Sequence, residues 1–566
     1  MIFKIGMMLL LLCMGAHAQV PASAPKSSEE PTTTTGTISG RVVNESGQPL
    51  AGASLFVRTV NSGFAARATA TDAEGNFRVN GLEPGLYIVS AGAPAYTTAS
   101  DPTTPPAYYR IGDSVRLQLV RGGVITGAVT NSLGEPVILA SVRAMMVRDA
   151  RGEALKIPSF GFREDMTDDR GVYRIYGLPP GTYIVAAGGF SSSAGFSPYN
   201  LDIPTYAPSS TRDNAAEISV RGGEESTADI RYRGEPGHIV SGTVKLTGPG
   251  GATVNLIPAN GSFTPGGSTF QTPNSRGFGF NGLTDGDYDL VAQEFITTQT
   301  ATVPVLSVSE PRRVTVKGAD VTGIELFTRP LPSITGRVSL ESSKVPECQG
   351  KRAPLLAETF IRVQRHEKDA EKDRATYLRT FTGSASPDRN GDFALRNLMP
   401  GRYQFEPRFY ARYWYLRSIT LTSATAKQQR VDAAANWTVV KFGDQLSNLT
   451  ITLAAGAASI RGRLAAAEPP AGMAVYLVPA EPDKAEDVLR FFVTDTAADG
   501  TFAFNNLPPG RYWILAQTPD PQLATLAKLR QPEGALARAK LRRTAETQKS
   551  EIQLKPCQNV ADYQLK

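Results

Sequence analysis

The stretch Gly75-Asn76-Phe77-Arg78-Val79-Asn80-Gly81-Leu82-Glu83-Pro84-Gly85-Leu86-Tyr87 decides the fold of this chain, because recognisable copies of it return four more times. The copies occupy residues 171–183, 278–288, 391–403 and 500–512, and the copy at 278–288 is shortened. Side chains of a strand alternate between its two faces, so Phe77 and Val79 point to the same face and into a core. The chain then turns at Pro84-Gly85, and Tyr87 begins the next strand. Each copy therefore predicts two strands joined by a corner.

Three local features predict the geometry of this corner. Asp72 precedes the first strand, where its carboxylate accepts backbone hydrogen bonds from the residues ahead. Pro84-Gly85 suits the central pair of a type II turn, in which the glycine takes a left-handed conformation. A leucine before the turn and a tyrosine after it are typical of a tyrosine corner, whose phenol hydrogen-bonds backbone upstream. The tyrosines expected to hold these corners are Tyr87, Tyr183, Tyr288, Tyr403 and Tyr512.

A second motif opens each repeat. Ile38-Ser39-Gly40-Arg41-Val42 reads as a strand with a central glycine, and similar segments are centred on Gly127, Gly242, Gly336 and Gly462. These glycines lie on the order of 100 residues apart, which suits small β-sandwich domains and is too long for solenoid repeats. The 53 glycines and 40 prolines of the 566-residue chain favour many short strands over long helices. The predicted fold class is all-β, a tandem array of about five small Greek-key β-sandwich domains.

The two motifs divide the chain into segments. Residues 19–36 are rich in Pro, Ser and Thr and have no apolar periodicity, which is typical of a disordered linker. Leu523 to Arg543 reads as two short helices split by Pro532 and Gly534. The predicted order is a signal peptide at 1–18, a disordered linker at 19–36, β-sandwich repeats at 37–121, 122–233, 234–329 and 330–455, and a fifth repeat with a helical insertion at 456–566.

The first residues have the regions of a secretory signal peptide. Lys4 supplies the charge, Met7 to Met14 is an apolar run, and Ala16-His17-Ala18 is a small-residue site at which we expect cleavage after Ala18. The apolar run is too short to span a bilayer, and no later stretch has the roughly 20 apolar residues of a transmembrane helix. We expect an exported protein without a transmembrane segment, which is periplasmic, extracellular or associated with the cell surface.

Two cysteines remain after that cleavage. Cys348 and Cys557 form an even pair in a protein expected to be exported, where disulfides persist. A bridge between them would tie the fourth repeat to the fifth. The alternative is two separate thiols, buried or free, and the sequence leaves both possibilities open.

The charge of the chain does not point to nucleic acid. The net charge of +6 arises from 59 Lys and Arg against 53 Asp and Glu, spread over the whole length. The chain has no dense basic block and no nucleic-acid-binding motif. The expected partner is therefore a protein or a polysaccharide at the cell surface and not a nucleic acid.

The repeated motifs resemble the carboxypeptidase regulatory-like domain family. The first repeat has the fullest match, in Gly47-Gln48-Pro49-Leu50-Ala51-Gly52-Ala53 and in Asp72 to Tyr87. The resemblance touches nearly all of the chain after the linker, although the third repeat has lost the aspartate of the pattern. It implies a transthyretin-like (prealbumin-like) β-sandwich, related in fold to Cna-B modules and to carbohydrate-binding modules. It also implies a non-catalytic module outside the cytoplasm that often accompanies peptidases, surface receptors or outer-membrane transporters.

The sequence predicts no catalytic, cofactor-binding or metal-binding residues. Zinc carboxypeptidases need a His-x-x-Glu pair and a distant histidine, and neither His238-Ile239-Val240-Ser241 nor His366-Glu367-Lys368-Asp369 supplies it. Phosphate-binding loops, Cys-x-x-Cys pairs and nucleophile elbows are also missing from the sequence. We therefore expect a protein that is not an enzyme and that has no cofactor.

Aromatic residues in the loops after the corner strands are the candidate ligand-binding residues. They are Tyr108, Tyr109, Tyr206, Tyr413, Trp414 and Tyr415. Flat rings at the edge of a sandwich stack on apolar sugar faces when they are exposed, whereas buried rings only close the end of the sandwich. Their exposure therefore discriminates between the two roles.

Three functions are compatible with the sequence. The first is an exported, non-catalytic, multi-domain β-sandwich scaffold or binding protein of the cell envelope or extracellular space. The second is a carbohydrate-binding protein that uses the aromatic loops. The third is an accessory subunit of a peptidase or of an outer-membrane transport system.

Overall fold

The computed structural model describes residues 35–60, 67–98, 107–155, 163–189, 197–248, 250–259, 268–271, 277–296, 305–372, 384–422, 430–465, 472–520 and 523–565. All of them belong to one compact unit, Thr35–Lys566. The predicted signal peptide at 1–18 and residues 19–34 of the predicted linker lie outside the described residues.

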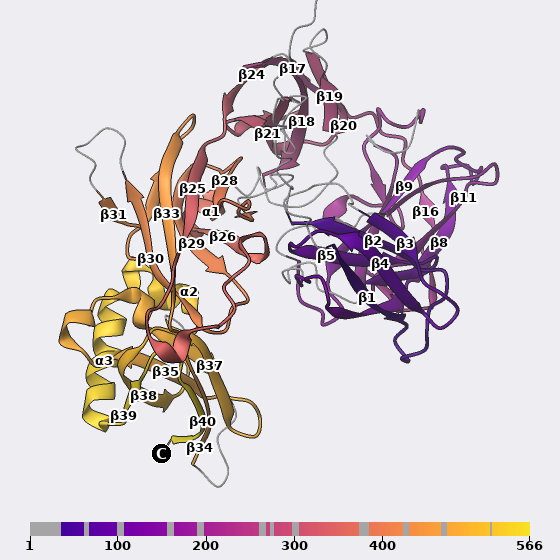
Figure 1. Cartoon of the computed structure of the whole chain (residues 1–566). Helices are drawn as coiled ribbons and strands as arrows, with labels where there is room; N and C mark the ends of the chain where they lie inside the picture. Colours follow the sequence, from indigo (N-terminus) through magenta and orange to yellow (C-terminus); the bar gives the residue numbers. More distant parts are fainter. Residues whose placement is uncertain are drawn as a thin grey trace, which may run out of the picture. The chain divides into compact units, whose positions relative to one another are not determined.

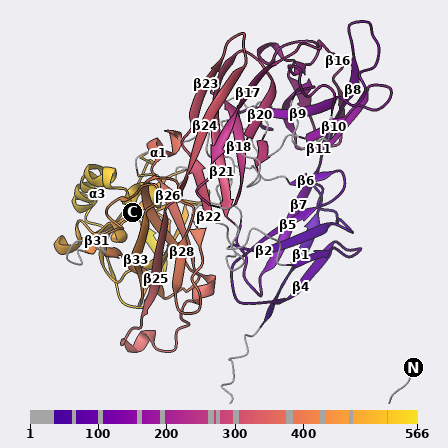
Figure 2. The ribbon, with the colours of Figure 1, turned by 90° about the horizontal axis from the view of Figure 1, so that it is seen from above.

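The described residues form an all-β structure in which sheets pair strands that are close in sequence, as predicted. Strands of one sheet group share a narrow band of colour in both ribbon views (Figure 1, Figure 2). We name the five groups the first to the fifth sandwich. Four of them contain two sheets, and the third consists of one eight-stranded sheet.

The first sandwich packs the sheet β4-β1-β7-β6 on the sheet β3-β2-β5. Its core includes Ile38, Leu55, Phe77 and Tyr87. Its strands are β1 (Gly36–Val43), β2 (Ser54–Thr59), β3 (Arg67–Ala70), β4 (Asn76–Leu82), β5 (Tyr87–Gly92), β6 (Tyr96–Thr98) and β7 (Ser114–Arg121).

The second sandwich again has two sheets, whereas the strands of the third are joined into one. The second has the sheet β11-β8-β15, with β16 also on β8, and the sheet β10-β9-β12-β13, with β14 also on β12. Its elements are β8 (Gly123–Thr130), β9 (Ser141–Arg148), β10 (Arg163–Met166), β11 (Val172–Leu178), β12 (Gly181–Ala187), β13 (Thr205–Tyr206), η1 (Arg212–Asn214), β14 (Ile218–Val220), β15 (Glu225–Thr227) and β16 (Ile230–Arg231).

The third sandwich has the strand order β19-β18-β21-β22-β24-β17-β20, with β23 on β21. Its strands are β17 (His238–Lys245), β18 (Gly251–Pro258), β19 (Ser268–Gln271), β20 (Gly277–Leu283), β21 (Gly286–Ile296), β22 (Val305–Ser309), β23 (Arg312–Val316) and β24 (Val321–Pro330).

The fourth sandwich pairs the sheet β28-β25-β33-β30-β31 with the sheet β27-β26-β29-β32. Its core includes Ile334, Phe393, Tyr403 and Trp414. Its elements are β25 (Ser333–Glu341), η2 (Pro346–Cys348), η3 (Leu356–Glu358), β26 (Phe360–Arg365), α1 (Glu367–Lys372), β27 (Ser384–Ala385), β28 (Asp392–Leu395), β29 (Gly401–Arg408), β30 (Trp414–Thr422), β31 (Arg430–Asp432), β32 (Thr438–Val440) and β33 (Gln445–Ala455).

The fifth sandwich contains the sheets β37-β34-β40 and β36-β35-β38-β39. Leu529 and Leu541 of its helices are buried with Tyr476 and Leu515 on the outer face of the second sheet. Its elements are β34 (Ala458–Leu464), β35 (Ala474–Pro479), η5 (Pro482–Lys484), η6 (Val488–Arg490), β36 (Phe492–Asp495), β37 (Thr501–Leu507), β38 (Gly510–Gln517), α2 (Leu526–Arg530), η7 (Pro532–Gly534), α3 (Ala535–Gln548), β39 (Glu551–Leu554) and β40 (Asn559–Leu565). Among the described helices, none has the length and apolar character to cross a membrane.

One arrangement of strands recurs in all five sandwiches. The opening strand lies between the strand of the repeated signature, which pairs with it antiparallel, and the closing strand, which pairs with it in parallel. In the first sandwich β1 pairs antiparallel with β4 and in parallel with β7. The other opening strands, β8, β17, β25 and β34, have the same two kinds of neighbour.

The central glycine of each opening strand makes room for an aromatic ring and a close backbone neighbour. Gly40 faces Phe77 in register, and a Cβ atom at Gly40 would lie 2.0 Å from Val115 O and 2.8 Å from the Phe77 ring. A side chain therefore cannot be added without moving the closing strand. The equivalent cross-strand pairs are Gly127 with Tyr173, Gly242 with Phe278, Gly336 with Phe393 and Gly462 with Phe502.

The predicted tyrosine corner is confirmed in all five copies. Each phenol donates a hydrogen bond to the backbone carbonyl four residues upstream. The distances are 2.7 Å from Tyr87 to Glu83, 2.8 Å from Tyr183 to Pro179, 2.9 Å from Tyr288 to Thr284, 2.7 Å from Tyr403 to Met399 and 2.9 Å from Tyr512 to Pro508. The aspartate turn is confirmed as well, since Asp72 Oδ1 accepts from the backbone N–H groups of Glu74 and Asn76.

The predicted type II turn is wrong. Gly85 does not have a positive φ, and the equivalent glycines have φ between 148° and 159°, far from the left-handed value near +80° that such a turn needs. The left-handed residue stands instead just before the leucine, at Gly81 with φ 71° in the first sandwich. The register of β4 on β1 shifts there by one residue, so the residue forms a β-bulge that bends the strand into the corner. The equivalent left-handed residues are Gly177, Gly282, Asn397 and Asn506.

Candidate functional site

Five of the residues singled out from the sequence come together where the fourth and fifth sandwiches meet, which we call the junction. They are Tyr413, Trp414 and Tyr415 at the start of β30 and the cysteines Cys348 and Cys557. The junction has two sides: a disulfide side formed by these residues with Asn506, and a histidine side around His366 and Glu533.

The disulfide joins two loops of different sandwiches. Cys348 ends η2 in the fourth sandwich, and Cys557 lies between β39 and β40 of the fifth. Their Cα atoms are 5.5 Å apart and their sequence separation is 209 residues. The backbone N–H of Cys557 also donates to Gly456 O at 3.1 Å, next to the connection between the two sandwiches. In the chain-entropy model, closing so long a loop stabilises the folded state by about 5 kcal/mol.

Of the three aromatic residues at this side of the junction, Trp414 is buried and the two flanking tyrosines are half-buried. Trp414 is only 5% exposed and belongs to the core of the fourth sandwich. The carbonyl of Tyr413 accepts from the N–H groups of Gly456 and Ala457 at 2.8 and 3.0 Å, and the Lys351 ammonium lies 4.7 Å from the Tyr413 ring centroid. Burial raises the pKa of the Tyr415 phenol. Trp414 therefore lies in a core and the two flanking tyrosines are half-buried, so the three rings do not form an open platform.

Asn506 connects the fifth sandwich to this segment. Its backbone is left-handed, with φ 56°, a conformation that asparagine tolerates better than most residues. Its side-chain amide donates to the carbonyls of Ala411 and Trp414, both at 2.7 Å. The bulge residue of the fifth sandwich thus satisfies two backbone acceptors of the fourth.

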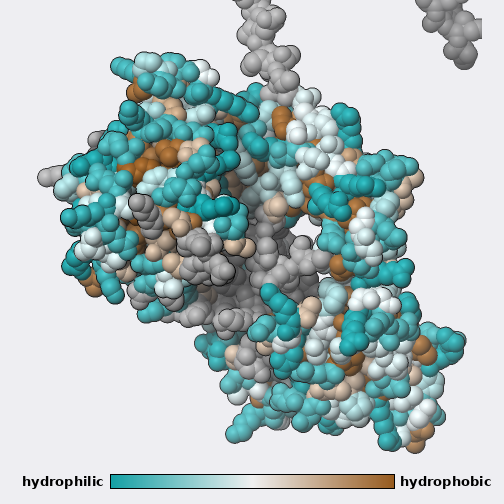
Figure 3. Space-filling view, turned by 90° about the horizontal axis from the view of Figure 1, so that it is seen from below, coloured by the Kyte–Doolittle hydropathy of each residue, from teal (hydrophilic) through white to brown (hydrophobic). Residues whose placement is uncertain are grey.

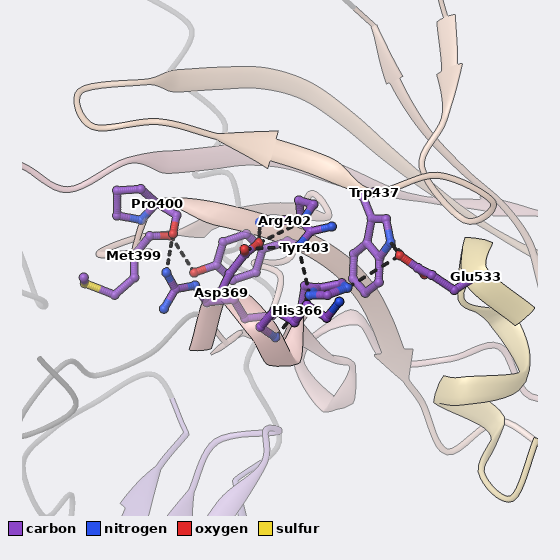
Figure 4. A network of polar contacts seen from close by, with 10 residues as sticks. His366, Asp369, Met399, Pro400, Arg402, Tyr403, Trp437 and Glu533 are labelled. Carbon is purple, nitrogen blue, oxygen red and sulfur yellow. Dashed lines mark hydrogen bonds and ion pairs between the residues drawn. The ribbon is translucent and has the colours of Figure 1, made fainter. Parts of the chain in front are cut away.

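On the histidine side, Glu533 of η7 contacts two side chains of the fourth sandwich (Figure 4). Trp437 Nε1 donates to its two carboxylate oxygens at 2.9 and 3.0 Å. His366 Nε2 lies 3.5 Å from Glu533 Oε1, and the His366 and Trp437 rings meet edge to face with centroids 5.0 Å apart.

Arg402 of β29 fixes the other face of the histidine. Its Nη2 donates to His366 Nδ1 at 3.0 Å, and its guanidinium forms a two-pronged ion pair with Asp369 of α1 at 2.9 and 3.1 Å. The hydrogen bonds from Arg402 lower the pKa of Asp369 to about 2. Figure 4 shows the resulting row from Asp369 through Arg402 and His366 to Glu533. The row links α1 and β29 of the fourth sandwich, through the His366 ring, to η7 of the fifth.

The remaining aromatic candidates lie elsewhere. The Tyr108 ring packs on Phe360 with centroids 4.8 Å apart, and burial raises its pKa. Tyr109 exchanges two backbone hydrogen bonds with Tyr87, at 2.8 and 2.9 Å. Tyr206 is 3% exposed and packs with Met145, Ile184 and Ala186. The structure therefore does not bring Tyr108, Tyr109 and Tyr206 together with the residues at the junction.

The side chains at the junction contact one another across the two sandwiches. Within the described ranges, no group of three or more His, Cys, Asp or Glu side chains is placed to hold a metal ion. His366 and Glu533 are engaged with Arg402 and Trp437. On the face shown in Figure 3, hydrophobic residues form small patches among hydrophilic ones in the part of the surface that is described.

Sequence reasoning missed Asn506, Trp437 and Glu533. A signal for Asn506 was present, because an asparagine stands there before the leucine where the first three sandwiches have Gly81, Gly177 and Gly282. No local pattern links Trp437 with Glu533, which are 96 residues apart.

Solved structures similar to this chain have low identities and TM-scores. The Bacillus anthracis TIE protein is 14% identical with a TM-score of 0.14, and the match covers 52% of this chain and 51% of that protein, so the chain spans about half the length of the protein it matches. BcpA, the major pilin subunit of Bacillus cereus, is 12% identical with a TM-score of 0.14, over 52% and 99%. GBS52, the minor pilin of Streptococcus agalactiae, is 13% identical with a TM-score of 0.18, over 35% and 96%. At these values the likenesses carry no statement about function.

No curated protein matches the chain. The match to a protein family falls on the first sandwich, where the sequence motif is fullest. Residues 37–112 match the carboxypeptidase regulatory-like domain, which confirms the predicted resemblance for this part of the chain.

Proposed function

We propose that the protein is an exported, non-catalytic scaffold of the cell envelope or extracellular space, built from five β-sandwich domains at 37–121, 122–233, 234–329, 330–455 and 456–566, and that it acts through contacts with other proteins at the cell surface. The observation that carries this proposal is the disulfide between Cys348 and Cys557. Such bonds persist in oxidising compartments outside the cytoplasm and are rare within it. The signal-peptide pattern at 1–18 independently agrees with export.

The junction supports a structural role. A covalent bond, the Asn506 amide and the contacts of Trp437 and His366 with Glu533 all connect the same two sandwiches. The side chains at these positions already contact one another, so a ligand would have to break these contacts in order to bind there. We infer that these contacts hold the fourth and fifth domains in one fixed arrangement, to which a partner binds.

Carbohydrate binding through the aromatic loops is the weaker candidate. Trp414 and Tyr206 are 5% and 3% exposed, which leaves neither ring a free face for a sugar. No observation on the described residues favours an accessory subunit of a peptidase or transport system over a scaffold.

Cell fractionation of the tagged full chain tests the proposal. We expect the native chain outside the cytoplasm, shortened at Ala18, and accessible to protease added to intact or osmotically opened cells. Ala18→Arg should block the shortening, whereas Ala22→Arg in the predicted linker is the matched control and should leave it unchanged. Full-length protein confined to the cytoplasm in all three cases contradicts the proposal.

A further inference from the structure

The first and last strands of every sandwich lie side by side and run in the same direction. In the first sandwich the parallel register extends from Ser39 opposite Ser114 to Val43 opposite Gln118. The corresponding pairs are β8 with β15 and β16, β17 with β24, β25 with β33 and β34 with β40. The chain enters each sandwich at the start of the first strand and leaves it at the end of the last.

This topology determines how tension acts on a sandwich. When the two ends of the chain are pulled, β1 is drawn backward and β7 forward along one axis, because the strands are parallel and each is loaded at its outer end. The hydrogen bonds between them are then sheared together. An antiparallel pair loaded at one end would instead open one bond after another, which needs much less force.

The parallel ladders differ in length. The ladder between β25 and β33 is the longest of the five, from Ser333 opposite Gln445 to Glu341 opposite Ala454. The ladder of the second sandwich is divided into two short pieces, one at β15 and one at β16. We expect the second sandwich to yield before the fourth when the disulfide is reduced.

The disulfide changes the path of tension through the last two sandwiches. Cys348 follows β25, which ends at Glu341, and Cys557 precedes β40, which begins at Asn559. Tension that enters through β25 crosses the sulfur atoms and leaves through β40. Residues 349–556, which contain most of both cores, lie outside this path.

The geometry points to a further function of the chain: it carries tensile load, with each of the first three sandwiches loaded in shear between its first and last strands and with the disulfide shielding the last two from extension. This inference rests on the proposed function, because a scaffold comes under tension only where it is bound to other proteins at the cell surface. It goes beyond that function by assigning the parallel strand pairs a mechanical role.

Single-molecule pulling of the full oxidised chain tests the inference. One handle is placed at the C-terminus, and the other either at the mature N-terminus or on an azide-bearing residue in place of Ser46, an exposed turn residue after β1. From Ser46 the force reaches β1 and β7 at the same end, so β7 is peeled off and not sheared. The folded protein is otherwise unchanged, and the second and third sandwiches serve as internal controls.

We expect the unfolding force of the first sandwich to fall several-fold when the handle moves to Ser46, while the forces of the second and third stay the same. An unchanged force for the first sandwich would overturn the shear assignment. In the second arm, reductant or Cys348→Ser should add unfolding steps with a total extension of roughly 700 Å, the length of the residues that the bond encloses. An equal total extension with and without reductant would overturn the load path. Both readouts use purified protein, so they are independent of where fractionation finds the chain.

Discussion

The side-chain amide of Asn506 in the fifth sandwich donates a 2.7 Å hydrogen bond to the carbonyl of Trp414 in the fourth. The same amide also reaches Ala411 O at 2.7 Å, so one side chain satisfies two backbone acceptors next to a buried tryptophan. The residue that bends the strand before the corner of one sandwich is therefore also the residue that attaches it to the sandwich before it.

Replacing Asn506 isolates the contribution of this contact. Asn506→Gly keeps the left-handed backbone and removes only the amide, so we expect a loss of about 2 kcal/mol in the free energy of unfolding, one hydrogen bond contributing about 1 kcal/mol. Asn505→Ala, at an exposed neighbour on the same strand, is the control and should change stability by less than about 0.5 kcal/mol. Chemical denaturation measures both. Equal effects of the two variants would mean that the amide does not hold the junction.

Adding one methyl group to the opening strand should disrupt the first sandwich. Gly40→Ala places a Cβ atom 2.0 Å from Val115 O, so β7 must move away from β1. We expect a loss of more than about 3 kcal/mol or failure of this sandwich to fold. Gly92→Ala is the matched control, because a Cβ atom there meets no atom within 4 Å. Thermal unfolding followed by circular dichroism distinguishes the two, and a Gly40→Ala protein as stable as the control would contradict the packing described.

The phenol of the fifth corner should contribute measurably to stability. Tyr512→Phe leaves the ring in the core but removes the donor to Pro508 O, so a buried acceptor loses its partner. We expect a cost of about 1–2 kcal/mol by denaturant titration. Tyr176→Phe, at a tyrosine that is 61% exposed, should have no measurable effect. A neutral Tyr512→Phe would show that the hydrogen bond does not stabilise the corner.

The ion pair between Asp369 and Arg402 predicts an acid-sensitive stability of the fourth sandwich. The pKa of Asp369 is lowered to about 2 in the folded protein, below its ordinary value of 3.8. A group with a lowered folded pKa adds stability that is fully present above its ordinary pKa and is lost as the pH falls through the folded value. The contribution of Asp369 should therefore disappear between about pH 4 and pH 2. Asp369→Asn should flatten this part of the stability profile measured by denaturation at fixed pH values, and an unchanged profile would contradict the role of the pair.

Much of the fold was predictable because it is repeated. The spacing of Phe77, Leu82 and Tyr87 predicts a strand, a corner and a strand in each repeat. The hydrogen bond of each corner tyrosine follows from local geometry, because its acceptor lies four residues upstream. The turn type was not predictable from Pro84-Gly85, because the bend is made three residues earlier by a bulge whose position depends on pairing with the opening strand.

The junction was predictable only in part. Cys348 and Cys557 were visible as a pair, but their proximity depends on how two loops from different sandwiches meet. The sequence predicts Trp414 to be an aromatic residue in a loop, and its burial depends on how β30 packs in the fourth sandwich. The hydrogen bond from Trp437 to Glu533 joins residues that share no sequence motif, so only the structure shows it.

The central claim is that this chain is an exported scaffold whose last two sandwiches are covalently joined. Peptide mapping by mass spectrometry, after thiol alkylation without reduction, tests it on protein isolated from its native compartment. We expect the peptides containing Cys348 and Cys557 to be recovered as one cross-linked pair from a fraction outside the cytoplasm. Recovery of both cysteines as separately alkylated thiols would contradict it.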